Sequence, residues 1–581
     1  MMRLGEGSVS PWVKFCLSAS AITLVACGGG DSATPPPVTP PPSGETPPPA
    51  SAGFGTDIDT KAEAAQFLRL AGLGGTNAEQ TQLTNGSAVD WVTDQLSMSP
   101  VDYRVKLGAR ISEDDANVHD VTQLIYEVMI GSDAELRTRM AYALSQIFAI
   151  NDSNLFNEGY GTAVWMDILD RNAFGNYRDL MGDVTRSPVM GSFLTYLYNW
   201  KGDDATGREP DENYARELLQ LFTIGLHELN PDGTIKTDGS GAPVPTFSNS
   251  DVIGLARVFT GYALAGTSLR YRDRFPDTWE RQMLMYDDFH ETRVKSFLGT
   301  TIPENTPGEE SIEIALDTIF AHPNVGPFVS RQLIQRFTAS DPAPDYVARV
   351  SAAFEAGTFT ADNGTQFGTG QRGDLSATIA AILLDEALHD ETMAVREGKV
   401  REPVLNFVQF VRTFQDGDVT VLQDGWNSLS NTTSIADSLG QNPLRSPSVF
   451  NFYRPGFVAP KTESGDLGLT APELQIVNDG SMVGYMNFMY SFISRDDGHW
   501  EQLLIPDLTY EIDLADDATA LVDHLDLVLT GGRLMDETKS AIATALNALP
   551  IRAANDAQDR RSRVNIALTM VVISPEYMTL N

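Results

Sequence analysis

Apolar residues recur at helical spacing along almost all of the chain after residue 60, and this pattern limits the possible folds more than any other feature. Ala64, Phe67, Leu68 and Ala71 stand at positions i, i+3, i+4 and i+7, which lie on one face of a helix. The glycine-rich stretch over 72–75 predicts the end of that helix. The chain therefore begins its folded part with an amphipathic helix.

A second helix is predicted from its first turn. Ser132 and Glu135 have the spacing of a capping box, in which each side chain satisfies a backbone N–H at the start of a helix. The residues that follow form one apolar stripe: Leu136, Met140, Ala143, Leu144 and Ile147.

Similar helical patterns continue to the end of the chain. They cover residues 161–200, 211–225, 250–264, 311–338, 344–356, 374–387, 400–415, 470–494, 516–528, 536–548 and 556–573. Between Leu229 and Asn249, two glycine-containing turns flank short Thr and Ile runs, which predicts a β-hairpin. The expected fold class is mainly α: a large multi-helix body with a small β-hairpin insertion. No second proline-rich linker interrupts residues 57–581, so we expect one domain there.

Residues 1–26 have the features of a lipoprotein signal peptide. Arg3 and Lys14 form a basic start, and an apolar run ends in Leu24-Val25-Ala26-Cys27. This box resembles that of bacterial lipoproteins, whose cysteine thiol accepts diacylglycerol, so we expect Cys27 to carry lipid. Gly28 follows, where an aspartate would resemble an inner-membrane retention signal. The prediction is therefore an exported protein, anchored by lipid to the outer membrane or cell surface.

Residues 27–56 form a Gly/Pro-rich segment with three proline triplets. Consecutive prolines favour the extended polyproline II conformation, at about 3.1 Å per residue. This segment is predicted to be a tether between the lipid anchor and the helical body.

Cysteine content and charge exclude several classes of function. Cys16 and Cys27 are the only cysteines, and Cys16 lies in the predicted signal peptide, so disulfides and cysteine-based catalysis or metal binding are not expected. There are 78 acidic against 41 basic residues, for a net charge of -37. Because nucleic-acid binding requires clustered cations, we expect no nucleic-acid partner.

Several motifs resemble the bacterial domain of unknown function 1800 family. The segment Pro210–Gly225, with the sequence PDENYARELLQLFTIG, is similar to the signature helix of that family. Further similar stretches follow in the family's order: 64–75, 139–150, 173–177, 251–262, 290–299, 322–324, 373–375, 399–403 and 574–577. The resemblance implies an exported, largely helical protein without an established activity. It also implies a possible partner, an exported protein of the domain of unknown function 1501 family.

The signature helix has a narrow polar stripe. Asn213, Arg216, Glu217 and Gln220 stand at i, i+3, i+4 and i+7, and apolar residues cover the remaining circumference. Such a stripe is typical of an ion-paired seam between helices, and it is also compatible with a ligand-binding or catalytic row. Gln220 stands where the family usually has an acidic residue and Phe222 where histidine is frequent, so no metal site is expected at these two positions.

His290 is the histidine most suited to acid–base chemistry. It lies in Asp287-Asp288-Phe289-His290-Glu291, and neighbouring carboxylates keep a histidine near its working pKa. The alternative is an ordinary loop histidine. No two histidines have the spacing of a zinc site on one helix, and Asn230, Asp232, Thr234 and Asp238 match a calcium loop only in part. We therefore expect no metal and no cofactor.

Two hypotheses of function remain. The first is a cell-envelope binding or assembly protein that docks an exported partner, with the aromatic and arginine residues of 442–457 as an exposed patch or, alternatively, as packing under a loop. The second is a hydrolase of envelope or extracellular polymer. It requires a pocket where the signature helix, Arg257 and His290 meet, with Glu217 or His290 as acid or base.

Overall fold

The computed structural model describes residues 57–151, 155, 158–266, 277–388, 398–415, 419, 429–494 and 506–580. All of them belong to one compact unit, Pro47–Asn581. The predicted signal peptide and the whole predicted tether, including Cys27, lie outside the described residues. No helix in the described part of the chain is long and apolar enough to cross a membrane.

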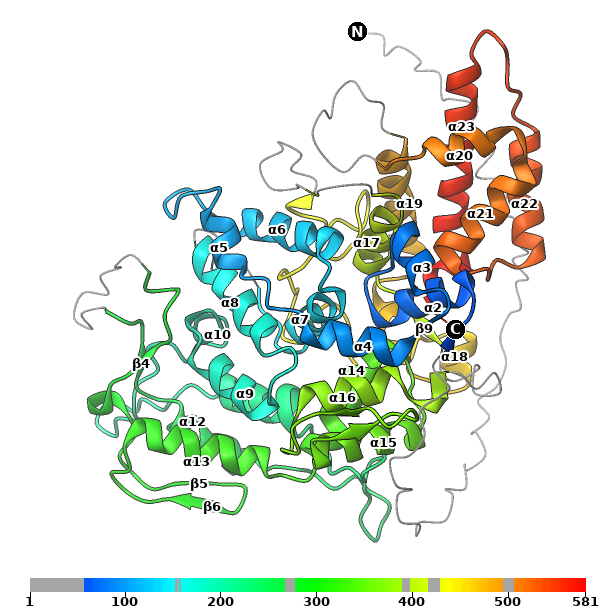
Figure 1. Cartoon of the computed structure of the whole chain (residues 1–581). Coiled ribbons are helices and arrows are strands. Elements are labelled where there is room, and N and C mark those ends of the chain that lie inside the picture. The colour runs from blue at the N-terminus through cyan, green and yellow to red at the C-terminus, as the bar shows by residue number, and fades with distance from the viewer. Residues whose placement is uncertain are drawn as a thin grey trace, which may run out of the picture. The chain divides into compact units, whose positions relative to one another are not determined.

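The first third of the described chain is a series of helices, as the periodicity predicts (Figure 1). They are α2 (Lys61–Ala71), α3 (Asn77–Leu83), α4 (Ala88–Ser97), α5 (Tyr103–Gly108), α6 (Val118–Gly131), α7 (Glu135–Ile147), α8 (Gly159–Arg171), α9 (Tyr177–Arg186) and α10 (Pro188–Phe193). The helical pattern over 161–200 is thus three helices, because the chain turns at residues 172–176 and again before Pro188.

The predicted capping box at Ser132 and Glu135 is wrong. Ala134 is the N-cap of α7 and makes no side-chain capping bond. The Glu135 carboxylate instead accepts a hydrogen bond from the Leu73 backbone N–H at 3.1 Å and pairs with Arg412 at 2.9 Å. The Glu135 side chain therefore binds residues far away in the sequence and does not cap its own helix.

The middle of the chain contains the signature helix and several of the longer helices. It comprises α11 (Asn213–Glu217), the π-helix η2 (Leu218–Thr223), α12 (Asn249–Val258), η3 (Asp287–Phe289), α13 (Gly308–Phe320), α14 (Val325–Phe337), α15 (Pro344–Ala356), α16 (Leu375–Leu383), η4 (Glu386–Leu388) and α17 (Pro403–Phe414). The predicted 344–356 helix agrees with α15, which has Pro344 in its first turn and the left-handed Gly357 after its end.

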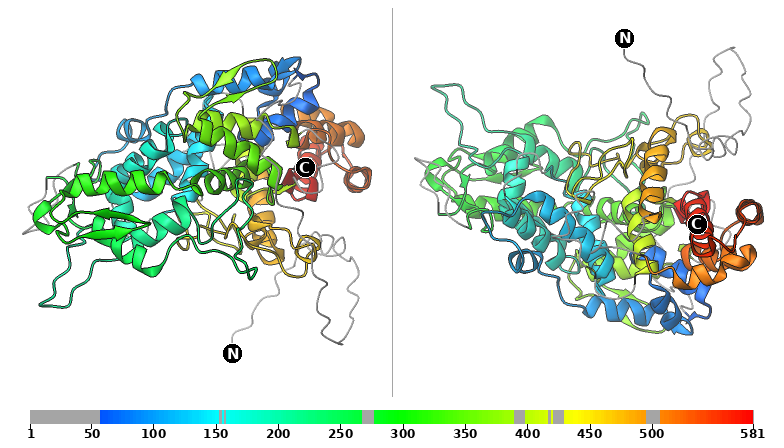
Figure 2. Two further views of the ribbon diagram at one scale, coloured as in Figure 1. Left: turned by 90° about the horizontal axis from the view of Figure 1, so that it is seen from below. Right: turned by 90° about the horizontal axis from the view of Figure 1, so that it is seen from above.

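The C-terminal part is also helical. It comprises α18 (Glu463–Asp466), η6 (Pro472–Gln475), α19 (Asp479–Ile493), α20 (Thr509–Asp513), η7 (Leu514–Asp516), α21 (Ala518–Thr530), α22 (Asp536–Asn547), α23 (Asp556–Val572) and α24 (Pro575–Met578). Helix α2 packs against α21, so the beginning of the described chain lies beside its end (Figures 1 and 2). Arg69 of α2 donates hydrogen bonds to the carbonyl oxygens of Thr530 and Tyr577.

The described strands form short antiparallel pairs. They are β1 (Asp57–Ile58) with β2 (Gly86–Ser87), β3 (Tyr262–Ala263) with β4 (Leu284–Met285), β5 (Lys295–Phe297) with β6 (Thr300–Ile302), β7 (Phe359–Thr360) with β8 (Gln366–Phe367), and β9 (Lys399–Val400) with β10 (Thr579–Leu580). The region 229–249 has hairpin hydrogen bonding but only isolated bridges, such as Leu229↔Ile235 and Thr237↔Pro243. The predicted mainly α fold with small hairpins is confirmed.

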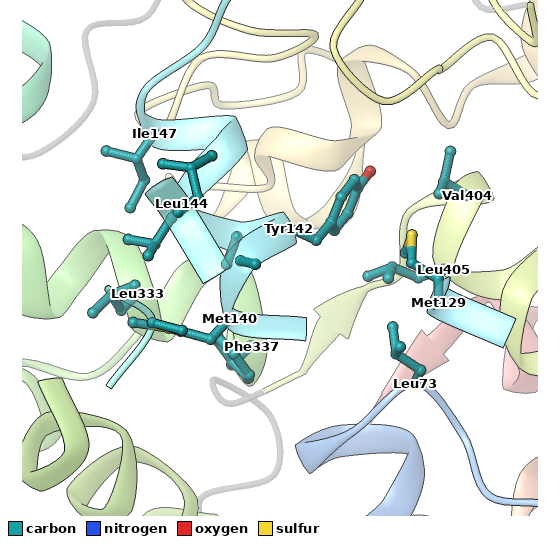
Figure 3. Packing of buried hydrophobic residues seen from close by; sticks show 14 of the residues in the cluster. Leu73, Met129, Met140, Tyr142, Leu144, Ile147, Leu333, Phe337, Val404 and Leu405 are labelled. Carbon is teal, nitrogen blue, oxygen red and sulfur yellow. The ribbon is translucent and has the colours of Figure 1, made fainter. Parts of the chain in front are cut away.

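Helix α7 lies in the middle of the core and is buried along its whole length. Figure 3 shows Met140, Leu144 and Ile147 on the side that faces Leu333 and Phe337 of α14, and Tyr142 on the side toward Val404 and Leu405 of α17. Each large apolar side chain removed from water in this way stabilises the fold by about 1.5–3 kcal/mol. Because α7 is enclosed on all sides, its charged and polar side chains are enclosed with it.

Candidate functional site

The signature helix is a regular α-helix only up to Glu217. From Leu218 to Thr223 its backbone follows π-helical hydrogen bonding, for example from the Ile224 N–H to the Leu219 carbonyl at 3.0 Å. The wider turn changes the 3.6-residue period after Glu217. Gln220 is nonetheless half-buried, like Arg216 and Glu217, whereas Leu218 and Leu219 are buried, so Gln220 stays on the less buried side of the helix. Single π-helical turns occur frequently at functional sites.

The polar stripe of this helix does not form one connected ion-paired seam among the described residues. Arg216 pairs with Glu212 at 2.8 Å and contacts Asn249 at 3.3 Å, while Asn213 donates to the Thr195 hydroxyl at 2.9 Å. Glu217 Oε2 is buried without a hydrogen-bond partner among the described residues. Burial raises the pKa of Glu217, and the charge of Arg216 lowers it only in part.

His290 is a buried structural residue. Its Nδ1 lies 2.9 Å from the Thr260 carbonyl oxygen, and its Nε2 lies 3.3 Å from the Ser311 hydroxyl. Burial lowers the pKa of His290, which favours the neutral ring. Both ring nitrogens are thus engaged, and the side chain joins the loop after α12 to α13.

The predicted acid and base make no direct polar contact with each other among the described residues. No hydrogen bond or ion pair between described residues links any two of Glu217, Arg257 and His290. Arg257 Nε is also buried without a hydrogen-bond partner in this described region. The predicted constellation around His290 therefore has no support in these contacts, although Glu217 and Arg257 each keep an unpaired polar atom.

Glu291, the neighbour of His290, predicts a pH dependence of stability. Burial opposes its ionisation, but hydrogen bonds from Arg293 and Gly202 and the charge of Arg293 lower its pKa from 4.5 to about 2. Because the folded-state pKa is the lower one, this stabilisation is complete above about pH 4.5 and is lost as the pH falls toward 2. We expect Glu291→Gln to lower the free energy of unfolding by about 2–3 kcal/mol at pH 6 and by almost nothing near pH 2.

Urea unfolding of the wild type and of Glu291→Gln at pH 6 and near pH 2 measures this difference in the free energy of unfolding. Glu310→Gln is the matched control, because Glu310 is exposed in α13 and has no side-chain partner among the described residues. An equal loss for Glu291→Gln at pH 6 and pH 2 contradicts the prediction.

A pocket of about 450 Å³ lies between the beginning and the end of the described chain. Its lining includes Glu79, Asp133, Arg412, Tyr510, Glu511 and His524; we call it the His524 pocket. His524 Nε2 lies 2.7 Å from Glu511 Oε1, and the His524 ring packs edge-on against Tyr510 with centroids 4.8 Å apart. When Nε2–H donates to Glu511, Nδ1 remains an acceptor without a hydrogen bond to any described residue.

Sequence reasoning did not find the His524 pocket. Glu511 and His524 are 13 positions apart, on α20 and α21, and no local motif connects them. A carboxylate–imidazole pair of this kind orients the ring for proton transfer. Among the ion pairs between described residues, this is the only one that includes a histidine.

The segment 442–457 is divided between core and surface. Asn442 and Tyr453 are buried, and the Tyr453 hydroxyl donates to Glu402 at 2.7 Å. Phe450, Phe452 and Phe457 are half-buried, whereas Arg454 is exposed and stacks on Phe450 at 5.2 Å. We call the partly exposed residues Phe450, Phe452, Arg454, Phe457 and Val458 the Phe450 patch.

The calcium-like loop uses its carboxylates for its own turns. Asp232 Oδ1 accepts hydrogen bonds from the backbone and hydroxyl of Thr234, and Asp238 Oδ1 accepts from Ser240 in the same way. Across the described ranges, no group of three or more His, Cys, Asp or Glu residues is placed to hold a metal ion.

Comparison with known proteins identifies the family. The model of the family described as "Protein of unknown function (DUF1800)" matches residues 66–579, from the first helix of the fold to its last strand. No curated protein and no solved structure matches the chain. The match covers the signature helix and both ends of the helical body, which confirms the resemblance seen in the sequence. The chain therefore belongs to the DUF1800 family of proteins of unknown function.

Proposed function

We propose that this chain is an exported lipoprotein, held at the outer membrane or cell surface by lipid on Cys27, whose helical body binds a second exported protein. The lipoprotein-type box at 24–27 and the proline-rich tether support the anchored part of this proposal. The partner that the family resemblance implies is an exported protein of the domain of unknown function 1501 family.

The Phe450 patch is the observation that carries the binding proposal. An exposed arginine stacked on a half-buried aromatic ring, with two further phenylalanines and the exposed Val458 nearby in the chain, has the composition of an interface core. Aromatic and arginine anchors commonly provide most of the binding energy of an interface.

Co-purification of the two exported proteins tests the proposal. We expect Arg454→Ala combined with Phe452→Ala to weaken the complex at least about 30-fold, which corresponds to about 2 kcal/mol. Arg281→Ala, at an exposed arginine outside the patch, is the matched control and leaves the affinity unchanged. Equal affinities for the patch variant and the control contradict the assignment. Cys27→Ser tests the anchor separately, because it moves the protein from the membrane to the soluble fraction.

The His524 pocket favours a second candidate function, hydrolysis of an envelope or extracellular polymer. In this mechanism Glu511 orients His524, whose free Nδ1 takes a proton from water as the water oxygen bonds to the substrate. The protonated ring then gives that proton to the leaving group as the bond between the two parts of the polymer breaks. We expect His524→Gln to abolish release of soluble fragments from purified envelope polymer, measured by mass spectrometry. His322→Gln is the control. Release at the wild-type rate by the His524 variant contradicts this function.

A further inference from the structure

Three arginine side chains are buried in the middle of the protein. They are Arg139 on α7, Arg336 on α14 and Arg401 directly after β9, with 2%, 3% and 1% of their surface exposed. We call them the arginine cluster. Guanidinium groups keep their charge in almost every protein environment, so burial of three of them requires compensation.

The three arginines are neighbours. Arg139 Nη2 donates a hydrogen bond to the Arg336 carbonyl oxygen. Burial lowers the pKa of Arg139 and of Arg401, and the neighbouring arginines act in the same direction: Arg336 lowers the pKa of Arg139, and Arg139 lowers the pKa of Arg401. Arg139 thus lies between the other two.

The two nearby carboxylates are occupied by other groups. Glu402 Oε1 accepts from the Tyr453 hydroxyl at 2.7 Å, and Oε2 accepts from Gln146 and Gln441 at 2.5 and 2.6 Å. Glu473 Oε1 pairs with Lys399 at 2.5 Å, and its Oε2 accepts from Ser340 at 2.7 Å. Neither carboxylate makes an ion pair with an arginine of the cluster in the described structure, although, against the effect of burial, Tyr453 and both carboxylates raise the pKa of Arg336. The Arg139 and Arg336 guanidinium groups also lie over the rings of Phe337 and Tyr453, at 4.8 and 4.6 Å from the ring centroids.

Several guanidinium nitrogens consequently have no hydrogen-bond partner among the described residues. They are Arg139 Nη1, Arg336 Nε and both Arg401 Nη1 and Nη2. The Arg401 side chain makes no hydrogen bond to any described residue, although its backbone N–H donates to the Met578 carbonyl at 2.8 Å. A buried unpaired donor costs about 1–3 kcal/mol, and more when it is charged.

The local charge is also unbalanced. Within this group, Arg139, Arg336, Arg401 and Lys399 contribute four positive charges and Glu402 and Glu473 two negative ones, an excess of two positive charges. The buried Arg69, whose pKa is lowered by burial and by the charge of Arg401, adds a further positive charge nearby. An apolar interior would make that excess prohibitive without a counter-ion. The chain as a whole has a net charge of -37, so this group of buried cations differs in sign from the protein around it.

We propose that the arginine cluster binds one small inorganic oxyanion, such as phosphate or sulfate, inside the folded protein. Planar guanidinium groups present paired N–H donors that match the oxygens of an oxyanion, and a dianion balances the two excess charges. The ion is enclosed by α7, α14 and the β9 segment, so it is acquired as the chain folds. This site is independent of the proposed docking of a partner.

Equilibrium unfolding in urea tests the proposal, because the unfolded chain exchanges the ion freely. We expect the unfolding equilibrium constant to fall about tenfold for each tenfold rise in phosphate or sulfate above its dissociation constant, at constant ionic strength. Arg401→Met abolishes this dependence and, without oxyanions, is at least as stable as the wild type. Arg563→Met is the control: Arg563 is buried but donates to the carbonyl oxygens of Leu549 and Ala515, so its variant keeps the dependence.

Three outcomes overturn the proposal: no dependence in the wild type, the same dependence in Arg401→Met, or a dependence on chloride alone. A second measurement covers the case in which Arg401→Met does not fold. The wild-type chain is refolded in selenate, crystallised and measured at the selenium edge. An anomalous peak within hydrogen-bond distance of the Arg401 guanidinium supports the site, and ordered water alone at that position overturns it.

Discussion

Replacing Lys399 with methionine is expected to lower the free energy of unfolding by about 3–5 kcal/mol. Lys399 and Glu473 are both fully buried, and their charged groups are 2.5 Å apart. The substitution leaves the Glu473 carboxylate without its counter-charge, and it also removes the donor to the Gln335 carbonyl oxygen. Chemical denaturation at pH 7 measures the loss.

The double variant Lys399→Met/Glu473→Met provides the control for this prediction. It removes both charges and replaces them with apolar side chains of similar size, so we expect it to regain most of the lost stability. A single variant within 1 kcal/mol of the wild type, or a double variant less stable than the single one, contradicts the assigned role of the pair.

Arg412→Met is expected to have an effect of similar size, about 3–5 kcal/mol. The Arg412 guanidinium donates to the carbonyl oxygens of Gly74, Ile130 and Ser132. It also pairs with Glu135 at 2.9 Å and with Glu79 at 3.2 Å. The Arg412 side chain of α17 therefore joins the loop after α2 to the end of α6. Its removal leaves the carbonyl oxygens of both segments without this hydrogen-bond donor.

The pH dependence of this loss identifies its cause. Burial already raises the pKa of Glu135 to about 7, and the charge of Arg412 is the largest opposing influence. Without Arg412 the pKa of Glu135 rises further. The buried carboxyl group then stays protonated and uncharged at low pH, whereas at higher pH the cost of ionising it lowers the free energy of unfolding. We expect the variant to lose less stability at pH 5 than at pH 8. Arg412→Met/Glu135→Gln should show no such difference.

Helix positions were predictable where the pattern of a few neighbouring residues decides them. Helix α15 begins with Pro344 and ends just before Gly357, and these two residues mark its limits without any knowledge of the rest of the chain. The pattern over 311–338 is equally strong, but it contains a turn at residues 322–324 that separates α13 from α14. Helical periodicity predicts the state of a residue more reliably than the point at which a helix stops.

The candidate sites were harder to predict, because their residues are far apart in the sequence. The polar stripe of the signature helix was visible locally, yet Arg216 pairs with Glu212 and leaves Glu217 unpaired. Lys399 and Glu473 are 74 positions apart, and their ion pair has no signal in either neighbourhood. The arginine cluster has no local signal either, because Arg139 follows Glu135 and Arg137 in the same helix and Arg336 follows Arg331 in another, so neither residue stands out among its neighbours.

The sequence alone determined that the folded part is mainly helical, that it lacks disulfide-forming cysteines after Cys27, and that it belongs with the family whose motifs it carries. Those properties depend on composition and on spacing over a few residues. Only the tertiary structure decided that His290 is a buried structural histidine, that Glu511 and His524 share a pocket, and that three arginines meet in the core. These arrangements depend on which helices pack together, because packing sets the partner and the solvation of each charge.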